Sequence, residues 1–353
     1  MNPPTLSMTM TNYNHAHFLP EAMQSVAEQS YQPMEWIIID DASTDNSMEI
    51  LAAFAQEHSN IRLIRNDQNM GIIYNLNRLL ELASGDYIVG LASDDKFLPG
   101  FFEKAMQLLE QYPQAGLCSA ASLIMDEAGN HTSLATALPL INMKAGYISP
   151  QQALYLMQFH GSWIAGNVTV YKRQALLEAG GFIQKLGSYA DGFIQEVLAL
   201  RHGACFIEEP LGVWRVRTTN YSVTISTKPE HELTILAQAV ELMTTKYCDL
   251  FPPAYIDVAI KRWLRRYSML HWQKLLTEQR QFVTNTAKRF EYSGVSRLDY
   301  LILATMRLLV IMQDLGVKVL LGLRFGVPHN RLPSGIRKIY RFYNTRKLKK
   351  IEG

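Results

Sequence analysis

Cysteine is scarce in this chain. Cys118, Cys205 and Cys248 are the three cysteines among 353 residues, and they are too few and too far apart for a zinc knuckle or a disulfide framework. The first residues contain no basic segment followed by an apolar run, so no signal peptide is expected. Both observations favour a protein of the reducing cytoplasm.

Uninterrupted apolar runs are short. Residues 301–325 are rich in Leu, Ile, Val and Met, yet they are interrupted by Arg307, Asp314, Lys318 and Arg324. A helix that spans a bilayer needs about 20 consecutive apolar residues, so no spanning helix is expected. Two alternatives are left for this segment. It is a helix that packs against the main domain or against a second copy in a homo-oligomer, or it is a helix that lies in the membrane interface.

Excess charge is small overall but uneven. The net charge is +2, whereas residues 331–353 contain eight Lys and Arg against one Glu, so this tail is +7 and the rest is −5. Basic and aromatic residues mixed in this way suit anionic lipid headgroups, and a solvated basic end is the alternative. Nucleic acid is not expected as a partner, because no nucleic-acid-binding fold surrounds the tail and the main domain is acidic. The tail therefore indicates either a solvated end or peripheral contact with the inner face of the plasma membrane.

Short apolar runs alternate with segments of helical periodicity between residues 6 and 120. The expected strands are Leu6–Met10, Glu35–Ile39, Ile61–Ile64, Tyr87–Leu91 and Gly116–Ala120. Strict alternation of strand and helix is typical of βαβ units. The sequence therefore predicts a Rossmann-like α/β fold, with a mostly parallel sheet flanked by helices.

The pattern loosens after residue 121. We expect a hairpin with its turn at 126–130 and short strands at Asn167–Tyr171, Ala204–Ile207 and Val213–Val216. From residue 230 onward the signals are helical, over 231–247, 254–276 and 297–325. The predicted organisation is an α/β domain over 1–229, a helical region over 230–330 and a basic tail over 331–353.

Two adjacent carboxylates follow the fourth expected strand. Asp94 and Asp95 come directly after Tyr87–Leu91, and ligands of open α/β sheets bind outside the carboxyl ends of the strands. Neighbouring carboxylates repel each other unless they share a cation, and oxygen ligands favour Mg²⁺ or Mn²⁺. The pair therefore indicates a phosphate-bearing substrate, the alternative being that Asp94 caps the helix that Pro99 begins and Asp95 faces solvent.

Motifs at four strand ends together resemble glycosyltransferase family 2, which has the GT-A fold. They are Thr11-Asn12-Tyr13-Asn14, the segment from Trp36 to Asp45, Asn69-Met70-Gly71 with Asn77, and Gly85-Asp86-Tyr87-Ile88 leading to Ser93-Asp94-Asp95. The resemblance covers roughly residues 5–222. It implies an inverting enzyme of bacterial cell-surface polysaccharide biosynthesis, which moves a sugar from a nucleotide-diphosphate sugar to a hydroxyl of a glycan or lipid-linked acceptor.

The resemblance also implies a nucleotide site. Thr11, Tyr13 and Asp41 would hold the nucleotide, with Tyr13 stacked on the base and Asp41 accepting the imide N–H of uracil. That pairing favours a UDP-sugar. The alternatives are a packed aromatic ring for Tyr13 and a helix cap for Asp41.

A metal site is implied next to it. Asp95 would ligate a divalent cation, Mn²⁺ or Mg²⁺, and Asp94 would contact the ribose or a metal-bound water, so that the cation neutralises the departing nucleoside diphosphate. Arg217 stands where the family often has His. Arginine cannot ligate a cation but can bind pyrophosphate, so weaker metal dependence is expected. Leu76 replaces a basic residue of many relatives and removes one phosphate contact.

The general base implied by the resemblance is Asp191. It follows Gly180-Gly181-Phe182 at the start of a helix, where the family commonly has Glu-Asp. Here Ala190 replaces the Glu, so the first carboxylate is missing. A positioned general base contributes about 10²- to 10⁴-fold to a reaction rate. The alternative role for Asp191 is that of a helix N-cap.

His160, Trp163 and Asn167 are expected to face the acceptor, with core packing as the alternative for Trp163. Three other classes of protein fit the sequence less well. A nucleotidyltransferase needs a Gly-rich phosphate loop, and residues 11–17 contain no glycine. A processive synthase would have spanning helices and a Gln-x-x-Arg-Trp motif, and neither is present. A non-catalytic binding relative would have no use for the three carboxylates at positions 94, 95 and 191.

Overall fold

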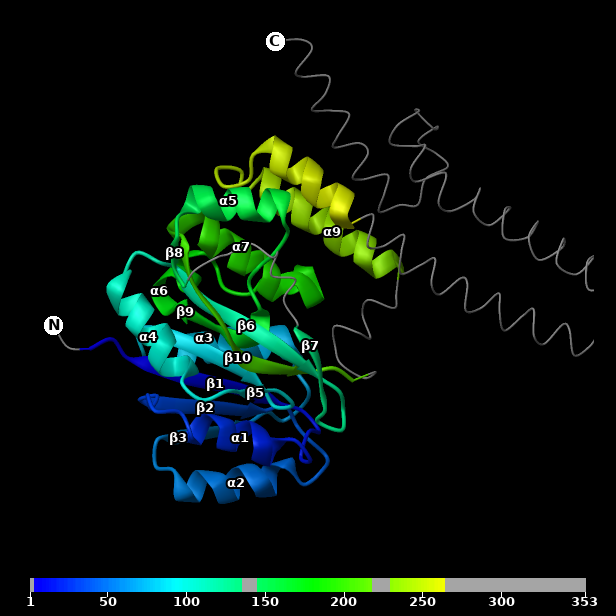
Figure 1. Ribbon diagram of the computed structural model, residues 1–353. Helices are drawn as coiled ribbons and strands as arrows, with labels where there is room; N and C mark the ends of the chain where they lie inside the picture. Colours follow the sequence, from blue (N-terminus) through cyan, green and yellow to red (C-terminus); the bar gives the residue numbers. More distant parts are fainter. Residues whose placement is uncertain (1–2, 135–144, 218–228, 264–353) are drawn as a thin grey trace, which may run out of the picture. The chain divides into compact units, whose positions relative to one another are not determined.

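The computed structural model describes residues 3–134, 145–217 and 229–263 (Figure 1). The chain divides into two compact units, Met1–Thr224 and Ile225–Gly353. In the second unit, α9 (Pro229–Thr244) and residues 253–263 are helical, and Trp263 Nε1 donates to Glu232 Oε2 at 3.1 Å. The basic tail and the helix expected at 297–325 lie outside the described residues. The three-part organisation of the chain therefore stays a prediction.

The first unit begins with the alternation of strands and helices that the sequence predicts. Its elements up to residue 111 are β1 (Leu6–Asn12), α1 (Leu19–Ala27), β2 (Glu35–Asp40), α2 (Ser47–Glu57), β3 (Ile61–Arg65), α3 (Ile72–Leu82), β4 (Tyr87–Ala92), β5 (Lys96–Phe97) and α4 (Phe101–Gln111). The second half comprises β6 (Leu117–Met125), β7 (His131–Leu134), β8 (Gly146–Ile148), α5 (Pro150–Phe159), β9 (Thr169–Lys172), α6 (Arg173–Glu178), α7 (Ala190–His202) and β10 (Ala204–Arg215).

One sheet runs through this unit in the order β3-β2-β1-β4-β9-β6-β10-β5. β3, β2, β1 and β4 are parallel to their neighbours, whereas β9 pairs antiparallel with both β4 and β6. The expected parallel order thus holds for the first four strands, and the remainder makes the sheet mixed. Because β1 lies between β2 and β4, the carboxyl ends of these three strands meet at one edge, which is where ligands of such sheets bind.

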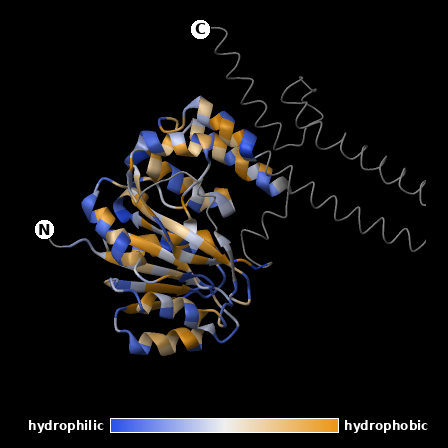
Figure 2. Ribbon diagram, in the orientation of Figure 1, coloured by the Kyte–Doolittle hydropathy of each residue, from blue (hydrophilic) through white to orange (hydrophobic). Residues whose placement is uncertain are grey.

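The core lies between the sheet and its helices. β1 is buried at almost every position, as expected of a strand covered on both faces. Leu19, Met23 and Val26 of α1 are buried at helical spacing, and Figure 2 shows the strands as predominantly hydrophobic between helices with hydrophilic outer faces. This packing fixes the strand ends that carry the polar motifs.

Local details confirm or correct the sequence predictions. Ser149 and Gln152 form a reciprocal capping box at the start of α5, which is a strong signal for a helix start. The hairpin is confirmed, since β6 and β7 pair antiparallel around the turn that Asp126 begins. The two short strands expected at 204–207 and 213–216 are wrong: β10 is one strand, in which bulges around Pro210 shift the register because proline cannot donate to the ladder.

Candidate active site

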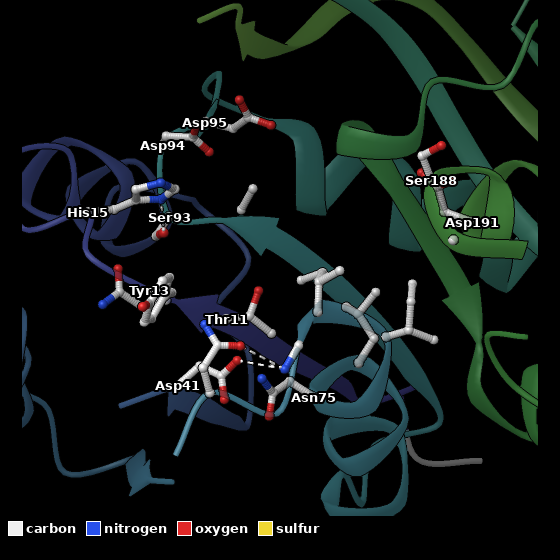
Figure 3. A pocket seen from close by; sticks show the side chains of 18 of the residues that line it. Thr11, Tyr13, His15, Asp41, Asn75, Ser93, Asp94, Asp95, Ser188 and Asp191 are labelled. Carbon is white, nitrogen blue, oxygen red and sulfur yellow. Dashed lines mark hydrogen bonds between the residues drawn. The ribbon is translucent and has the colours of Figure 1, made fainter. Parts of the chain in front are cut away.

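A cavity of about 620 Å³ opens at the carboxyl ends of β1, β2 and β4. Its polar lining includes Thr11, Tyr13, His15, Asp41, Asn75, Ser93, Asp94, Asp95, Ser188, Asp191 and Arg217. Figure 3 shows Asp41 and Thr11 on one side, Asp94 and Asp95 on a second, and Asp191 with Ser188 across from both. Residues as far apart in the sequence as Thr11 and Arg217 therefore share one pocket.

Asp41 is held in place by donors from the loop before α3. Its Oδ1 accepts from Asn66 Nδ2 at 2.7 Å and from Met70 N at 2.8 Å, and its Oδ2 accepts from Gly71 N at 2.9 Å. Burial acts to raise the pKa of Asp41, but these donors together with Asn75 outweigh it and lower the pKa below its ordinary value. Asp41 is therefore a fixed carboxylate whose Oδ2 retains room for a further donor.

The neighbouring Asp40 has a different role. It is completely buried, and it accepts from Ser43 N, Ser43 Oγ and Asn12 Nδ2 at 2.9, 2.6 and 2.8 Å. These bonds close the turn after β2, where Ala42 has a φ of 63°. Of the two carboxylates, Asp40 shapes the turn and Asp41 lines the cavity.

Tyr13 and Thr11 lie on the same side as Asp41. Tyr13 is 44% exposed, which leaves a ring face available for stacking, and Thr11 lies at the end of β1 beside Asn12. The structure thus brings together the three residues expected to hold a nucleotide. A buried, packed ring, the alternative for Tyr13, does not describe this side chain.

Asp94 and Asp95 lie in the turn after β4, and this turn is held by Arg215 at the end of β10 and by Arg217 just after it. Arg217 donates to Asp94 Oδ2 from Nε at 3.1 Å and from Nη2 at 2.9 Å. Arg215 donates to Asp95 Oδ1 through its backbone N at 2.8 Å and to Asp94 O through Nε at 2.9 Å. Burial, and secondly the charge of Asp94, raise the pKa of Asp95 well above its ordinary value, against the hydrogen bond from Arg215.

Arg215 is a structural residue that the sequence analysis missed. Its side chain is buried, its Nη2 pairs with Glu21 and its Nη1 donates to Glu127 O at 3.2 Å. Its guanidinium lies 4.8 Å from the centre of the Phe18 ring, and that of Arg217 lies 4.9 Å from it. Glu21 also pairs with Lys96 at 2.6 Å. Through Glu21, α1 therefore contacts both Arg215 and the lysine that follows Asp95.

His15 lies on the same side of the cavity as Asp94, and the sequence did not point to it. Its Nε2 lies 2.6 Å from Arg217 Nη2, and its Nδ1 lies 2.8 Å from Ser93 Oγ. Arginine can only donate, so Nε2 accepts and Nδ1 carries the proton donated to Ser93. Burial first lowers the pKa of His15, with Arg217 acting in the same direction and Asp94 against it. The ring is therefore a neutral acceptor that orients Arg217.

Two carboxylate oxygens on this side have no protein donor among the described hydrogen bonds, Asp94 Oδ1 and Asp95 Oδ2. Among residues 3–134, 145–217 and 229–263, no three His, Cys, Asp or Glu side chains are grouped to hold a metal. Mg²⁺ and similar cations are often held by one or two carboxylates together with substrate phosphates. The pair therefore fits a cation that binds with a diphosphate, and it does not form an all-protein cage.

Asp191 faces the cavity from the first turn of α7. Its Oδ1 accepts from Gly192 N at 2.8 Å, and a Cβ at Gly166 would lie 2.7 Å from its Oδ2, so glycine at 166 makes room for the carboxylate. The surrounding protein raises the pKa of Asp191 by desolvation, against the hydrogen bonds from the backbone of Gly192 and of Asp191 itself. A carboxyl with a raised pKa, exposed to a pocket, is the form expected of a general base.

The expected acceptor residues do not gather at this cavity. Trp163 is 1% exposed and packs edge-on against Phe206 at 5.7 Å, so its acceptor role is wrong and the core alternative is right. Asn167 donates to Ser122 Oγ at 3.0 Å, and His160 is the exposed C-cap of α5. Neither His160 nor Asn167 lines the cavity, whose lining instead includes Ser188 and Trp214.

In the part of the chain that the structure describes, no helix has the length and hydrophobicity that crossing a membrane requires. The expectation for the interrupted segment at 301–325 lies outside that part.

Comparison with known proteins shows which family this part of the chain resembles. Residues 7–163 match the family described as Glycosyl transferase family 2. EpsE of Bacillus subtilis (strain 168), whose name describes it as a glycosyltransferase, is 36% identical over 127 residues, which cover 36% of this chain and 46% of that protein. TuaG of the same organism, whose name refers to teichuronic acid biosynthesis, is 32% identical over 106 residues, covering 30% of this chain and 42% of TuaG. The chain thus spans less than half of the length of each of these two relatives.

Solved structures share the fold. Residues 1–349 of S. aureus TarS in complex with UDP-GlcNAc superpose with a TM-score of 0.56 at 15% identity, covering 68% of this chain and 67% of that one. The mannosyltransferase PcManGT from Pyrobaculum calidifontis, in complex with GDP-Man and Mn²⁺, superposes with a TM-score of 0.51 at 19% identity, covering 90% and 87%. Residues 7–163 are therefore similar to glycosyltransferase family 2, and the first unit has an α/β fold of the GT-A type.

Proposed function

We propose that the chain transfers a sugar from a nucleotide-diphosphate sugar to an acceptor hydroxyl with inversion. The observation that carries this proposal is the arrangement of one cavity, in which Asp41 lies on one side, the Asp94–Arg217 pair on a second and Asp191 opposite them. A base facing the anomeric carbon from across the leaving group suits a single displacement.

The nucleotide occupies the side formed by Thr11, Tyr13 and Asp41. The base stacks on the exposed Tyr13 ring, and Oδ2 of Asp41 accepts an N–H of the base in addition to the Gly71 N–H. An imide N–H of uracil meets this requirement, so UDP is the proposed nucleotide. The complex of TarS with UDP-GlcNAc and that of PcManGT with GDP-Man support a nucleotide-sugar as the donor class.

The diphosphate lies toward Arg217. Its guanidinium is already oriented by Asp94 and His15, so it can donate to phosphate oxygens without a large rearrangement. Asp95 and Asp94 would hold a divalent cation, Mn²⁺ or Mg²⁺, which supplies Lewis-acid neutralisation of the leaving diphosphate when bound. No protein acid is needed to protonate the leaving group.

Asp191 acts on the acceptor. Its carboxylate takes the proton of the acceptor hydroxyl as the oxygen forms a bond to the anomeric carbon, and the bond from that carbon to the diphosphate oxygen breaks with its electron pair. The acceptor class we propose is a glycan or lipid-linked glycan of a surface polysaccharide, supported by the name of TuaG. A membrane contact through residues 331–353 is part of this proposal, and it concerns residues outside the described part of the chain.

The experiment is turnover of UDP-sugars by the wild-type chain and by Asp191→Asn, with Glu110→Gln as a control that removes one exposed carboxylate charge from the outer helix α4. We expect transfer or slow donor hydrolysis by the wild type and by the control, and a loss of about 10²-fold or more in Asp191→Asn. Full turnover in Asp191→Asn would contradict the role of the base. If the wild type and the control bind a nucleotide but show no turnover, the chain is a non-catalytic relative.

A further inference from the structure

Asn77 lies in the middle of α3, where the helix itself gains nothing from it. Asparagine is a poor residue for a helix interior, because its amide competes with the backbone for hydrogen bonds. Asn77 does not line the cavity, and the nucleotide, metal and base sites described above do not use it. Its amide instead bonds to a segment 105 positions further along the chain.

The partner of Asn77 is the backbone of Phe182. Nδ2 of Asn77 donates to Phe182 O at 2.8 Å, and Phe182 N donates to Asn77 Oδ1 at 2.8 Å. One amide thus pairs both backbone groups of this residue, as a neighbouring strand would. Phe182 is 8% exposed, so removal of the amide would leave a buried donor and a buried acceptor without these partners.

Two glycines present the Phe182 backbone to Asn77. They end α6, where Gly180 N donates to Leu177 O at 2.9 Å and Gly181 N donates to Leu176 O at 3.0 Å. Their φ values are 93° and 67°, in the left-handed region that favours glycine. A Cβ at Gly181 would lie 2.5 Å from Asn77 Oδ1. Glycine at 181 is therefore required both by the backbone conformation and by the close approach of the amide.

The chain after Phe182 leads directly to the base. Residues 184–189 form a short helical turn, and Ala190 N donates to Gly187 O, which joins this turn to α7. Gly187 and Asp191 both line the cavity. The segment from Phe182 to Asp191 therefore forms one wall of the cavity, and its first residue is held by Asn77.

The other side of the Asn77 contact is the helix that supports the nucleotide side. Met70 N and Gly71 N, directly before α3, donate to Asp41, and Ile73 and Leu76 of α3 line the cavity. α3 is also in contact with residues 184–189. The Asn77–Phe182 hydrogen bonds thus join the helix beside Asp41 to the wall that carries the base.

We propose that Asn77 is a positioning residue: its two hydrogen bonds to Phe182 set the place of the wall at 187–191, and with it Asp191, relative to α3 and the bound nucleotide. The inference rests on the proposed function, in which Asp191 is the base and Asp41 binds the nucleotide. Asn77 acts through the backbone between 182 and 191 and touches no substrate.

The first test is hydrogen exchange of the full chain, measured by mass spectrometry. Asn77→Ala removes both bonds and favours the helix, since alanine is the best helix former. We expect the amides of 183–190 to exchange about 10-fold faster than in wild type, and those of β1 to be unchanged. Gly181→Ala, which displaces the amide from the other side, should do the same and serves if Asn77→Ala does not fold.

Asn60→Ala is the matched control. It also removes a bond from an asparagine amide to a backbone carbonyl, from Asn60 Nδ2 to Pro33 O at 3.1 Å, but Asn60 does not line the cavity. Exchange at 183–190 should be the same in Asn60→Ala as in wild type. Equal exchange at 183–190 in Asn77→Ala and wild type would overturn the inference.

Kinetics and binding give the second readout. Asn77→Ala should lower kcat about 10-fold, because small displacements of a reacting group are costly, while the dissociation constant of UDP stays within about twofold of wild type. Asn60→Ala should change neither. UDP binding that weakens as much as kcat falls would overturn the inference, since Asn77 would then act on the nucleotide side. Faster exchange in Asn77→Ala together with full turnover in Asp191→Asn would support the contact and overturn the proposed function instead.

Discussion

Nη2 of Arg217 lies 2.9 Å from Asp94 Oδ2 and 2.6 Å from His15 Nε2. The contact joins the residues that follow β10 to those that follow β4 and to the loop after β1. A positive charge therefore faces the cavity from a fixed position, and binding of an anion need not order it.

The first prediction concerns this arginine. Arg217→Ala should weaken binding of a nucleoside diphosphate about 10-fold or more, because charge-assisted hydrogen bonds contribute about 1.5–3 kcal/mol. Isothermal titration with UDP measures the change. Arg62→Ala, which removes an exposed arginine of β3, is the control and should bind as wild type does; an unchanged dissociation constant in Arg217→Ala would remove this residue from the diphosphate site.

Asp41 should make folding depend on pH. Its pKa in the folded protein lies below the ordinary value of 3.8, so its hydrogen bonds stabilise the fold fully at pH values above 3.8. This stabilisation is lost as the pH falls through the lower, folded-state pKa. Asp41→Asn should therefore cost about 2 kcal/mol at pH 7.

Urea unfolding of the wild type and of Asp41→Asn at pH 7 and near pH 3 checks the sign. The difference in the free energy of unfolding between the two proteins should shrink at the lower pH. A difference that stays constant or grows would mean that the three donors around Asp41 do not favour its ionised form.

Gly166 should be required for the position of the base. A Cβ there would lie 2.7 Å from Asp191 Oδ2, so Gly166→Ala must displace the carboxylate. We expect kcat to fall about 10²-fold while nucleotide affinity is kept, since small displacements of a reacting group are costly. Gly90→Ala, whose Cβ would meet Thr9 Oγ1 at an ordinary 3.6 Å, is the matched control; equal losses in both variants would show a general disturbance of the fold.

Tyr13 should contribute to UDP binding through its aromatic ring and not through its hydroxyl. Tyr13→Ala should weaken UDP binding by about 1–3 kcal/mol, which is the range for stacking of a base on an aromatic side chain, and Tyr13→Phe should bind nearly as wild type does. Fluorescence or calorimetric titration with UDP distinguishes the two variants. If Tyr13→Phe loses as much as Tyr13→Ala, the hydroxyl and not the ring is the contact.

The sequence was most informative where local pattern decides structure. Strands such as Glu35–Asp40 are buried on both faces and read as continuous apolar runs, and parallel strands bring Thr11, Asp41 and Asp94 to one edge. Arg215 and His15 were missed because their partners lie far away in sequence: Glu21 pairs with Arg215 across 194 positions and His15 with Arg217 across 202. Trp163 shows the converse error, since a ring that could stack on a sugar is buried by Phe206, a contact that no local pattern encodes.

The most direct test of the donor site is a thermal-shift panel of UDP, GDP, TDP and CDP, each with Mn²⁺, Mg²⁺ or EDTA, on wild type and Asp95→Ala. A nucleotide at 100 times its dissociation constant adds about 2.7 kcal/mol of stability. We predict that UDP raises the unfolding temperature of the wild type and that metal enlarges this shift. In Asp95→Ala the shift should no longer depend on metal. Weaker binding of UDP should persist in EDTA, through Arg217. If no nucleotide raises the unfolding temperature of the wild type under any metal condition, the cavity is not a nucleotide-sugar site and the proposed function is wrong.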